Sequence, residues 1–255
     1  MSNHKLVERD PEHYFKHRPR VPEDILHIAK SIYRKPIDLV VDLGSGPGNS
    51  TQDWTNVARH VIGVEPSKPL FDYAVRNKPE NITYINCFAE DTGIDPNCVD
   101  IVTASSAIHW MEPQATTKEV LRILKNDGIF MYFAPHPPLI PFLDIEQQKN
   151  IYLKNRPKVN DKQLRYEWGG SPANHFLKKE FNYTRKFFIS VKETWSGSDY
   201  LEWIKTGDDK RRHNLEDEYY ITLKDKVNNL WKNHEEVVFT FTAWIFKDKI
   251  NNPPG

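Results

Sequence analysis

The stretch VVDLGSGPGNST, residues Val40–Thr51, decides the fold, because branched aliphatic residues lead directly into three closely spaced glycines. The run Ile37–Gly44 is short, apolar and bounded by turn residues, which is typical of a parallel strand buried on both faces. A second strand is predicted at His60–Glu65. Polar residues behind the glycines can cap a connecting helix that runs to about Ala58: Asn49, Ser50 and Thr51. The segment therefore predicts a β-α-β unit.

The same alternation continues on both sides of this unit. A helix is predicted before it at Glu23–Tyr33, with Pro22 suited to the first turn. Beyond it, the apolar patterns predict a helix, two strands, another helix and a fifth strand: Pro69–Asn77, Ile82–Cys87, Val99–Ala107, Thr116–Asn126 and Gly128–Ala134. Strands separated by helices at this spacing predict an α/β fold, a doubly wound parallel sheet with right-handed crossovers.

This rhythm breaks at PHPPLIPF, Pro135–Phe142, because its four prolines prevent regular structure. Helical patterns follow to about residue 209, and alternation near 178–191 and 235–249 predicts late strands that return to the sheet edge. We therefore expect four regions: an N-terminal segment and helix (1–34), a cofactor-binding core (35–135), a helical lid or substrate region with a returning strand (136–210), and a C-terminal helix and edge strand (211–255).

Composition limits the class of partner. The 255 residues include 35 basic and 35 acidic side chains, so no net charge attracts the chain to nucleic acid or to an anionic membrane, and a small molecule is the expected partner. Cys87 and Cys98 have neither a disulfide pattern nor metal-ligand spacing, so no metal is expected. The polar N-terminus and the lack of a long apolar run predict a cytoplasmic protein. We expect it to be a monomer or a homodimer.

The glycine motif places bare backbone between a buried strand and a helix, where a ligand can reach main-chain N–H groups. The spacing is not the dinucleotide pattern G-x-G-x-x-G, because Asn49 stands at the last glycine position, and no triphosphate P-loop is present. Glu65 ends the second strand, where its carboxylate can accept hydrogen bonds from both hydroxyls of a ribose. Asp42, just ahead of the glycines, is a candidate to support the ligand site.

Four motifs together resemble the class I S-adenosylmethionine-dependent methyltransferases. They are VVDLGSGPGNST with VIGVEPS, NCFAEDTGI (Asn86–Ile94), VDIVTASSAIHWM (Val99–Met111) and VLRILKNDGIFMYF (Val120–Phe133). The resemblance implies a Rossmann-like seven-stranded sheet with S-adenosylmethionine as cofactor and S-adenosylhomocysteine as product. It implies that the cofactor is bound by Asp42, Gly44, Ser45, Gly46, Gly48, Glu65, Pro66, Ala89, Glu90 and Ser105.

Three further stretches resemble a narrower branch, the trans-aconitate methyltransferase-like enzymes of methyltransferase type 11, which methylate small carboxylic acids. These segments are YFKHRPRVP (Tyr14–Pro22), AIHW, and YLEWIKTGDD (Tyr200–Asp209). In that branch the residues matching Tyr14 and Arg18 close over the cofactor, and a guanidinium fork suits its carboxylate. A T-W-S tripeptide is usual where this sequence has Thr206–Asp208, which leaves the acceptor open.

The acceptor site is predicted from position. His109 and Trp110 follow the fourth strand at its carboxyl end, where open α/β sheets place ligands, and are expected to line the substrate and methyl pocket. Further candidates for contact with the acceptor come from the lid: Trp168, Trp203, Lys205, Arg211, Arg212 and His213.

The expected reaction is methylation of a small molecule, above all O-methylation of a carboxylic acid. A carboxylate acceptor needs a cation to place it but no base, whereas an amine or hydroxyl acceptor would need a base such as His109 or His17. N-methylation and hydroxyl O-methylation therefore stay open as alternatives. A catalytically silent module that only binds the cofactor on the same fold is a further alternative.

Overall fold

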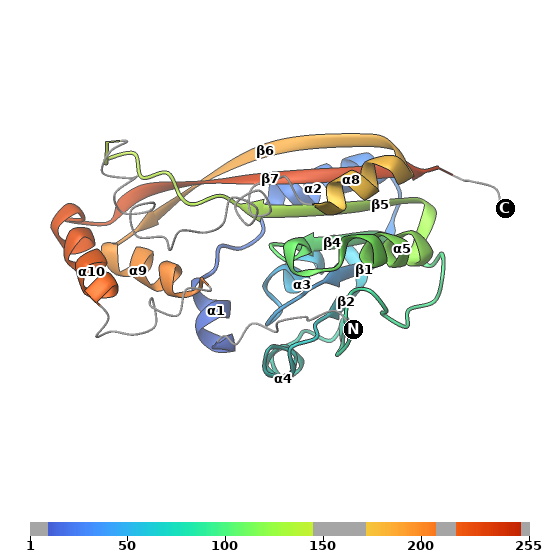
Figure 1. Ribbon diagram of the computed structural model, residues 1–255, viewed down its shortest axis with the longest axis horizontal. Coiled ribbons are helices and arrows are strands. Elements are labelled where there is room, and N and C mark those ends of the chain that lie inside the picture. The colour runs from blue at the N-terminus through green and yellow to red at the C-terminus, as the bar shows by residue number, and fades with distance from the viewer. Residues whose placement is uncertain (1–9, 145–171, 208–217, 251–255) are drawn as a thin grey trace.

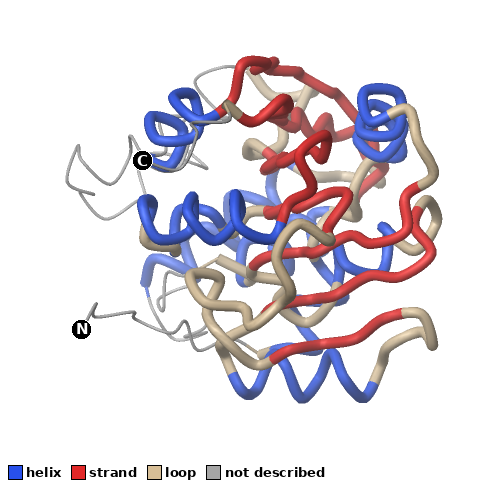
Figure 2. The backbone as a smooth tube through the Cα atoms, turned by 90° about the vertical axis from the view of Figure 1, so that its right-hand side faces the viewer, coloured by secondary structure: helices blue, strands red, loops and turns tan. Residues whose placement is uncertain are grey.

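The computed structural model describes residues 10–144, 172–207 and 218–250, which build one twisted sheet with helices on both faces (Figure 1). Figure 2 shows the strands running through the middle of the molecule with helices on either side. The sheet has seven strands in the order β3-β2-β1-β4-β5-β7-β6. The strands are β1 (Ile37–Leu43), β2 (Ala58–Val64), β3 (Ile82–Ile85), β4 (Val99–Ser105), β5 (Leu124–Pro135), β6 (Phe181–Trp195) and β7 (Glu235–Lys249).

The first five strands are parallel, and β7 pairs antiparallel with both β5 and β6. The helices of the described residues are α1 (Pro11–His17), α2 (Glu23–Tyr33), α3 (Asn49–Trp54), α4 (Lys68–Arg76), the short 3₁₀ helix η1 (Ile108–Trp110), α5 (Pro113–Ile123), α8 (Pro172–Glu180), α9 (Gly197–Lys205) and α10 (Glu218–Leu230). This confirms the predicted α/β class with a seven-stranded sheet. The returning strands are also present, with β6 at the edge.

Apolar residues on the two faces of the sheet form two separate clusters. Val40 and Val41 of β1 are both fully buried, and they belong to opposite clusters because successive side chains of a strand point to opposite faces. One cluster includes Trp54 of α3 and residues of α2, and the other includes residues of α5 and α8. The strand that precedes the glycines is thus buried on both faces, as its uninterrupted aliphatic sequence predicts.

Two predicted helix ends are wrong by a few residues. The helix after the glycines ends at Trp54, and β2 already begins at Ala58. Between them the N–H groups of Thr55, Asn56 and Val57 donate to carbonyls three residues back, so the chain leaves the helix through a tight turn. Fully buried Trp54 anchors that turn in the core. The later helix, α5, ends at Ile123, because the next residues already belong to β5.

A buried carboxylate joins several elements at the amino ends of β1 and β4. Asp100 accepts hydrogen bonds from the hydroxyl of Tyr33, from Lys125 Nζ at 2.6 Å, and from the N–H groups of Asp38 and Leu39, each at 2.9 Å. Burial by itself raises the pKa of Asp100, but these hydrogen bonds outweigh burial and hold that pKa below its usual value of 3.8. The ionised carboxylate therefore stabilises the fold.

We expect Asp100→Asn to lower the free energy of unfolding at pH 7 by about 2 kcal/mol, because hydrogen bonds to a charged group are among the strongest in proteins. A carboxylate with a lowered pKa contributes stability above its unfolded-state pKa and loses that contribution as the pH falls through its folded-state pKa. The difference between the proteins should therefore narrow below pH 3.8 in urea titrations. Asp127→Asn, which removes a half-exposed ion pair with Lys35, should cost under ~1 kcal/mol. Equal costs for the two variants would contradict this role of Asp100.

Candidate functional site

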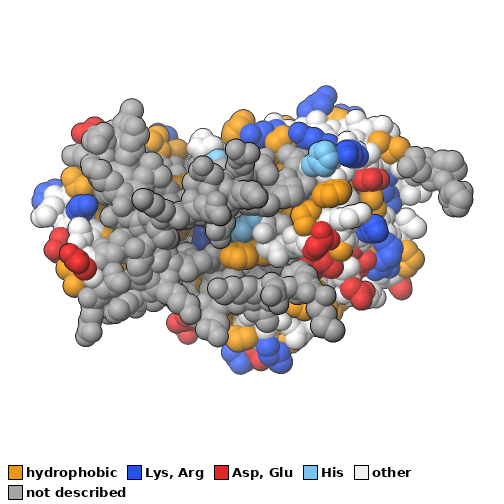
Figure 3. Space-filling view, in the orientation of Figure 1, with side chains coloured by type: hydrophobic (Ala, Val, Ile, Leu, Met, Phe, Trp, Pro, Cys, Tyr) orange, Lys and Arg blue, Asp and Glu red, His pale blue; other side chains and the backbone are white. Residues whose placement is uncertain are grey.

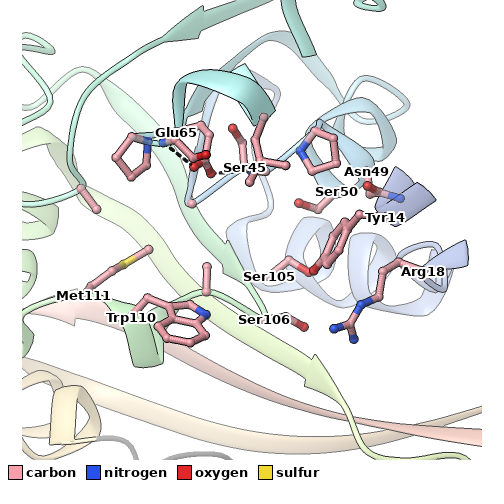
Figure 4. Close-up of a pocket in the computed structure, with 18 of the residues that line it drawn as sticks. Tyr14, Arg18, Ser45, Asn49, Ser50, Glu65, Ser105, Ser106, Trp110 and Met111 are labelled. Atoms are coloured by element: carbon pink, nitrogen blue, oxygen red, sulfur yellow. Dashed lines mark hydrogen bonds between the residues drawn. The ribbon is translucent and has the colours of Figure 1, made fainter. Parts of the chain in front are cut away.

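A pocket lies at the carboxyl ends of β1, β2 and β4, where the strand order reverses between β1 and β4. Open α/β sheets bind their ligands at such switch points. Figure 4 shows Glu65 and Ser45 toward one end of the pocket, Tyr14 and Arg18 at the other, and Trp110 and Met111 along a third side. Segments that are far apart in the sequence therefore meet around one space.

The glycine loop lines this pocket, and its backbone at Gly44 and Gly46 is left-handed. Gly44 and Gly46 have φ angles of 68° and 57°, values that glycine adopts without steric cost. A Cβ at Gly44 would lie 2.5 Å from Ala107 Cβ, so the start of η1 packs directly on the loop. A Cβ at Gly46 would meet nothing within 4 Å. Gly44 thus allows close packing, and Gly46 presents backbone to the pocket.

Glu65, at the end of β2, holds the loop through its side chain. Its Oε2 accepts a hydrogen bond from the Gly46 N–H and its Oε1 accepts one from the Ser67 N–H, each at 2.8 Å. The side chain is buried and lines the pocket. A carboxylate can accept several hydrogen bonds at once, so a ligand hydroxyl can also donate to Glu65.

Asp42 lies behind the loop and is not among the pocket-lining residues. Its Oδ2 accepts hydrogen bonds from Ser50 Oγ at 2.5 Å and from Thr51 Oγ1 at 2.7 Å. Complete burial raises the pKa of Asp42 to about 6, although the two hydroxyls oppose the shift. Asp42 therefore joins the end of β1 to the start of α3 and fixes the loop from below.

Helix α1 closes the pocket from the side of the N-terminal segment. Tyr14 and Arg18 both line the pocket, and the guanidinium of Arg18 lies 4.9 Å from the centre of the Tyr14 ring. Asn49 Nδ2 donates to the Phe15 carbonyl at 2.8 Å and so fastens α1 to the start of α3. On the other side, Arg18 Nη2 donates to the Thr206 carbonyl, just after α9, at 3.4 Å. These contacts position the Arg18 guanidinium at the pocket.

Three polar atoms of pocket-lining residues are buried without a hydrogen-bond partner among the described residues. They are Arg18 Nε, Ser45 Oγ and Asn49 Oδ1. Buried polar groups are almost always paired in folded proteins, because leaving one unpaired costs about 1–3 kcal/mol. The pocket is therefore suited to a polar ligand that supplies both donors and acceptors.

The remaining wall is apolar and comes from distant strands. Trp110 and Met111 lie in and after η1, Pro135 ends β5, and Phe241 belongs to β7. His109 is not a lining residue; it is exposed, and its ring centre lies 4.9 Å from that of Trp110. Among the described lining residues, the side chains that can titrate or carry charge are Tyr14, Arg18, Glu65 and Glu90.

Most of the predicted site residues meet at this pocket. The lining residues among them are Tyr14, Arg18, Gly44, Ser45, Gly46, Glu65, Pro66, Ala89, Glu90, Ser105 and Trp110, whereas Asp42, Gly48 and His109 lie outside the lining. Of the predicted lid contacts, Trp203 is buried and Lys205 pairs with Glu202. The other four lie outside the described residues: Trp168, Arg211, Arg212 and His213.

Several lining residues were not predicted from the sequence. Phe88, Ser106 and Met111 lie inside motifs already quoted and could have been found from their position beside the predicted residues. Pro135 directly follows the predicted fifth strand, whereas Phe241 could not have been found, because it reaches the site only through the pairing of β7 with β5.

The sheet has the class I methyltransferase fold. Its parallel strands have the order β3-β2-β1-β4-β5, β7 completes it in the antiparallel direction, a glycine loop follows β1 and an acidic residue follows β2. Residues 41–132 match the methyltransferase domain family. The predicted resemblance is confirmed at this level, whereas the trans-aconitate branch stays a prediction.

The similarity to known proteins extends beyond residues 41–132. The chain is 27% identical over 184 residues to the Saccharomyces cerevisiae protein CRG1, assigned as an S-adenosylmethionine-dependent methyltransferase, with 66% of this chain and 62% of that protein aligned. It is 30% identical over 121 residues to a candidate methyltransferase of Dictyostelium discoideum, covering 48% and 45%. The chain thus spans less than two thirds of either relative. A candidate type II methyltransferase from Anaeromyxobacter dehalogenans has a similar fold, with a TM-score of 0.72, 19% identity, and coverage of 90% and 97%.

The surface agrees with the neutral composition. Acidic and basic side chains are interspersed over the described part of the face in Figure 3. Within the described ranges, no helix has the length and apolar character needed to cross a bilayer.

Substituting the glycines one at a time separates backbone strain from packing. We expect Gly44→Ala to lower the free energy of unfolding by about 3 kcal/mol, because a left-handed backbone and a clash with Ala107 act together. Gly46→Ala should lower the free energy of unfolding by about 1 kcal/mol, since the added Cβ strains the left-handed backbone but meets no neighbouring atom. Urea denaturation of both variants measures the difference. An equal loss in the two would show that η1 does not depend on the space beside Gly44.

Proposed function

We propose that this chain is an S-adenosylmethionine-dependent methyltransferase whose pocket binds the methyl donor and whose acceptor is a small, largely apolar carboxylic acid. The observation that carries the donor assignment is the pairing of the left-handed glycine loop with the Glu65 carboxylate at one pocket end. The matched domain family and the relatives assigned as methyltransferases support it.

The polar groups of the pocket suit the chemical parts of this donor. The Glu65 carboxylate can accept hydrogen bonds from ribose hydroxyls, while Ala89 and Glu90 line the part of the pocket where a base would lie. Arg18, with Nε unpaired among the described residues, can bind the donor's carboxylate with its planar fork. Ser45 Oγ and Asn49 Oδ1 can pair with the polar groups of the amino-acid part.

The acceptor assignment follows from what the lining residues can and cannot do. The described lining residues include no histidine or lysine that could remove a proton from an amine or alcohol. A carboxylic acid is already ionised at neutral pH and needs no base. The walls formed by Trp110, Met111 and Phe241 favour an apolar body on that acid.

When bound, the donor would supply a methyl group activated by the positive sulfonium: a carboxylate oxygen would bond to the methyl carbon as the carbon–sulfur bond breaks, giving a methyl ester and the thioether as leaving group. The chain's own contribution is to orient the reactants and exclude water, which can be worth on the order of 7 kcal/mol in favourable cases. Helix α1 with Tyr14 and Arg18 covers one side, and Trp110 with Phe241 shields another. None of these side chains has to transfer a proton.

Glu65 offers a direct test of donor binding. We expect Glu65→Ala to weaken S-adenosylhomocysteine binding by about 30-fold, the equivalent of ~2 kcal/mol for a lost charge-assisted hydrogen bond. The affinity of Glu65→Gln, which keeps one acceptor oxygen, should fall between that of Glu65→Ala and that of the wild type. Isothermal titration calorimetry gives the affinities, and Glu80→Ala, an exposed carboxylate before β3, is the matched control.

The two possible failures of this test are distinguishable. Unchanged affinity in a folded Glu65→Ala protein would remove Glu65 from the donor site. Loss of the native unfolding transition without ligand would instead place its main role in holding Gly46, and the Glu65→Gln result would then decide whether it also contacts the donor.

The acceptor class is tested with carbon skeletons that carry a carboxylate, an amine or a hydroxyl in turn. With isotopically labelled donor, we expect label transfer to apolar carboxylic acids, giving a product that mild alkali hydrolyses because it is an ester. Trp110→Ala should lower kcat/KM for the best acid about tenfold, since it removes apolar contact area, while changing S-adenosylhomocysteine affinity less than twofold. Trp110→Phe is the conservative control.

Each outcome of that panel has a clear meaning. Alkali-stable label on amines or alcohols would replace the carboxylate assignment by N- or hydroxyl O-methylation. Donor binding without transfer to any compound of the panel would favour the silent cofactor-binding module instead.

A further inference from the structure

We propose that His13, His17 and Glu202 form a binding site for a divalent transition-metal ion, for which zinc is the natural probe, and that the ion joins α1 to α9. The side-chain ligand atoms of these three residues all lie within 4.8 Å of one another. The site lies on the side of α1 that faces α9, whereas Tyr14 and Arg18 of the same segment line the pocket. It is therefore separate from the methyl-donor pocket.

The spacing of the two histidines suits a metal. His13 and His17 are four residues apart on one helix, so their side chains share a face, and their ring centres are 4.7 Å apart. Two histidines at this spacing on a helix, with a carboxylate from elsewhere, form a known type of zinc site. The imidazole of His17 forms no hydrogen bond with the described residues, so a ring nitrogen is available.

Glu202 supplies the third ligand from the neighbouring helix. Its Oε2 lies 2.9 Å from His13 Nε2, while its Oε1 accepts a hydrogen bond from Lys205 Nζ at 2.7 Å. The two oxygens are thus divided between the histidine side and the lysine. A metal bound to Oε2 alone leaves the Lys205 hydrogen bond in place, and such second contacts commonly orient ligating carboxylates.

The required movement is small. In a tetrahedral zinc site with bonds of about 2.1 Å, ligand atoms lie ~3.4 Å apart. His13 Nε2 and Glu202 Oε2, at 2.9 Å, would therefore separate slightly, and the longest separation, at most 4.8 Å, would close by about 1 Å. His13 and Glu202 are partly exposed, at 22% and 31%, so their side chains can adjust and water can fill the fourth position. The Lys205 ammonium opposes a cation, so we expect a Kd of about 1 µM rather than the tighter binding of zinc-finger sites.

The sequence alone did not reveal this cluster. The expectation of no metal rested on Cys87 and Cys98. Glu202 is distant from the histidines in the chain, so only the packing of α1 against α9 brings the ligands together. Figure 1 shows these two helices side by side.

Zinc titration of the metal-free full-length chain tests the proposal. We expect one zinc ion bound per chain, at least tenfold weaker binding in His17→Ala and in Glu202→Gln, and unchanged binding in His27→Ala, an exposed histidine of α2. Cobalt as substitute should give the strong visible absorption of four-coordinate geometry in the wild type only. Zinc should also raise the thermal unfolding midpoint of the wild type and not of His17→Ala.

Two results would overturn the site. One is no zinc binding at about 100 µM, roughly a hundred times the expected Kd. The other is equal binding in the wild type, His17→Ala and Glu202→Gln, which would place the ion elsewhere. Glu202→Gln keeps the shape of the side chain and should fold. It therefore tests the site even if the His17→Ala protein is unfolded. The test measures zinc binding, cobalt absorption and thermal unfolding, so its result does not depend on whether the chain transfers methyl groups.

Discussion

The geometry of the pocket depends on how the end of β2 holds the glycine loop. The N–H groups of Gly44 and Ser45 both donate to the Val64 carbonyl, at 2.8 and 3.0 Å, and the next N–H, that of Gly46, donates to the Glu65 carboxylate. Val64, which ends β2, and Glu65, which follows it, thus fix three consecutive residues of the loop. Asp42 secures the loop from behind through Ser50 and Thr51. The left-handed backbone that exposes the loop to a ligand is therefore maintained by contacts on both sides.

The rest of the site is assembled around this fixed loop by segments from both ends of the chain. Helix α1 is fastened to α3 through Asn49 and contacts α9 through His13 and Glu202, so it bridges the sheet core and the C-terminal helices. Strand β7 inserts between β5 and β6 and brings Phe241 to the pocket. In the proposed function, the loop determines the donor and these later segments determine the acceptor. The proposed metal would act on the same bridge, because it joins α1 to α9.

Local patterns in the sequence were sufficient for the parallel strands, the glycine loop and Glu65, because each depends on residues next to one another in the chain. They were insufficient where a residue's role depends on the direction of its side chain or on contacts with residues distant in the chain. Asp42 was found next to the glycines, but the sequence does not show that its side chain faces away from the pocket. His109 and Trp110 are adjacent, yet within η1 only Trp110 lines the pocket. Phe241 carries no local signal at all, because its role arises from antiparallel pairing with β5.

The central claim is that the loop and Glu65 bind an adenosyl amino acid rather than a dinucleotide. Calorimetric titration of the wild-type chain with S-adenosylhomocysteine and, separately, with NAD tests it most directly. We expect saturable binding of one S-adenosylhomocysteine per chain and no measurable heat with NAD. Binding of NAD without binding of S-adenosylhomocysteine would contradict it.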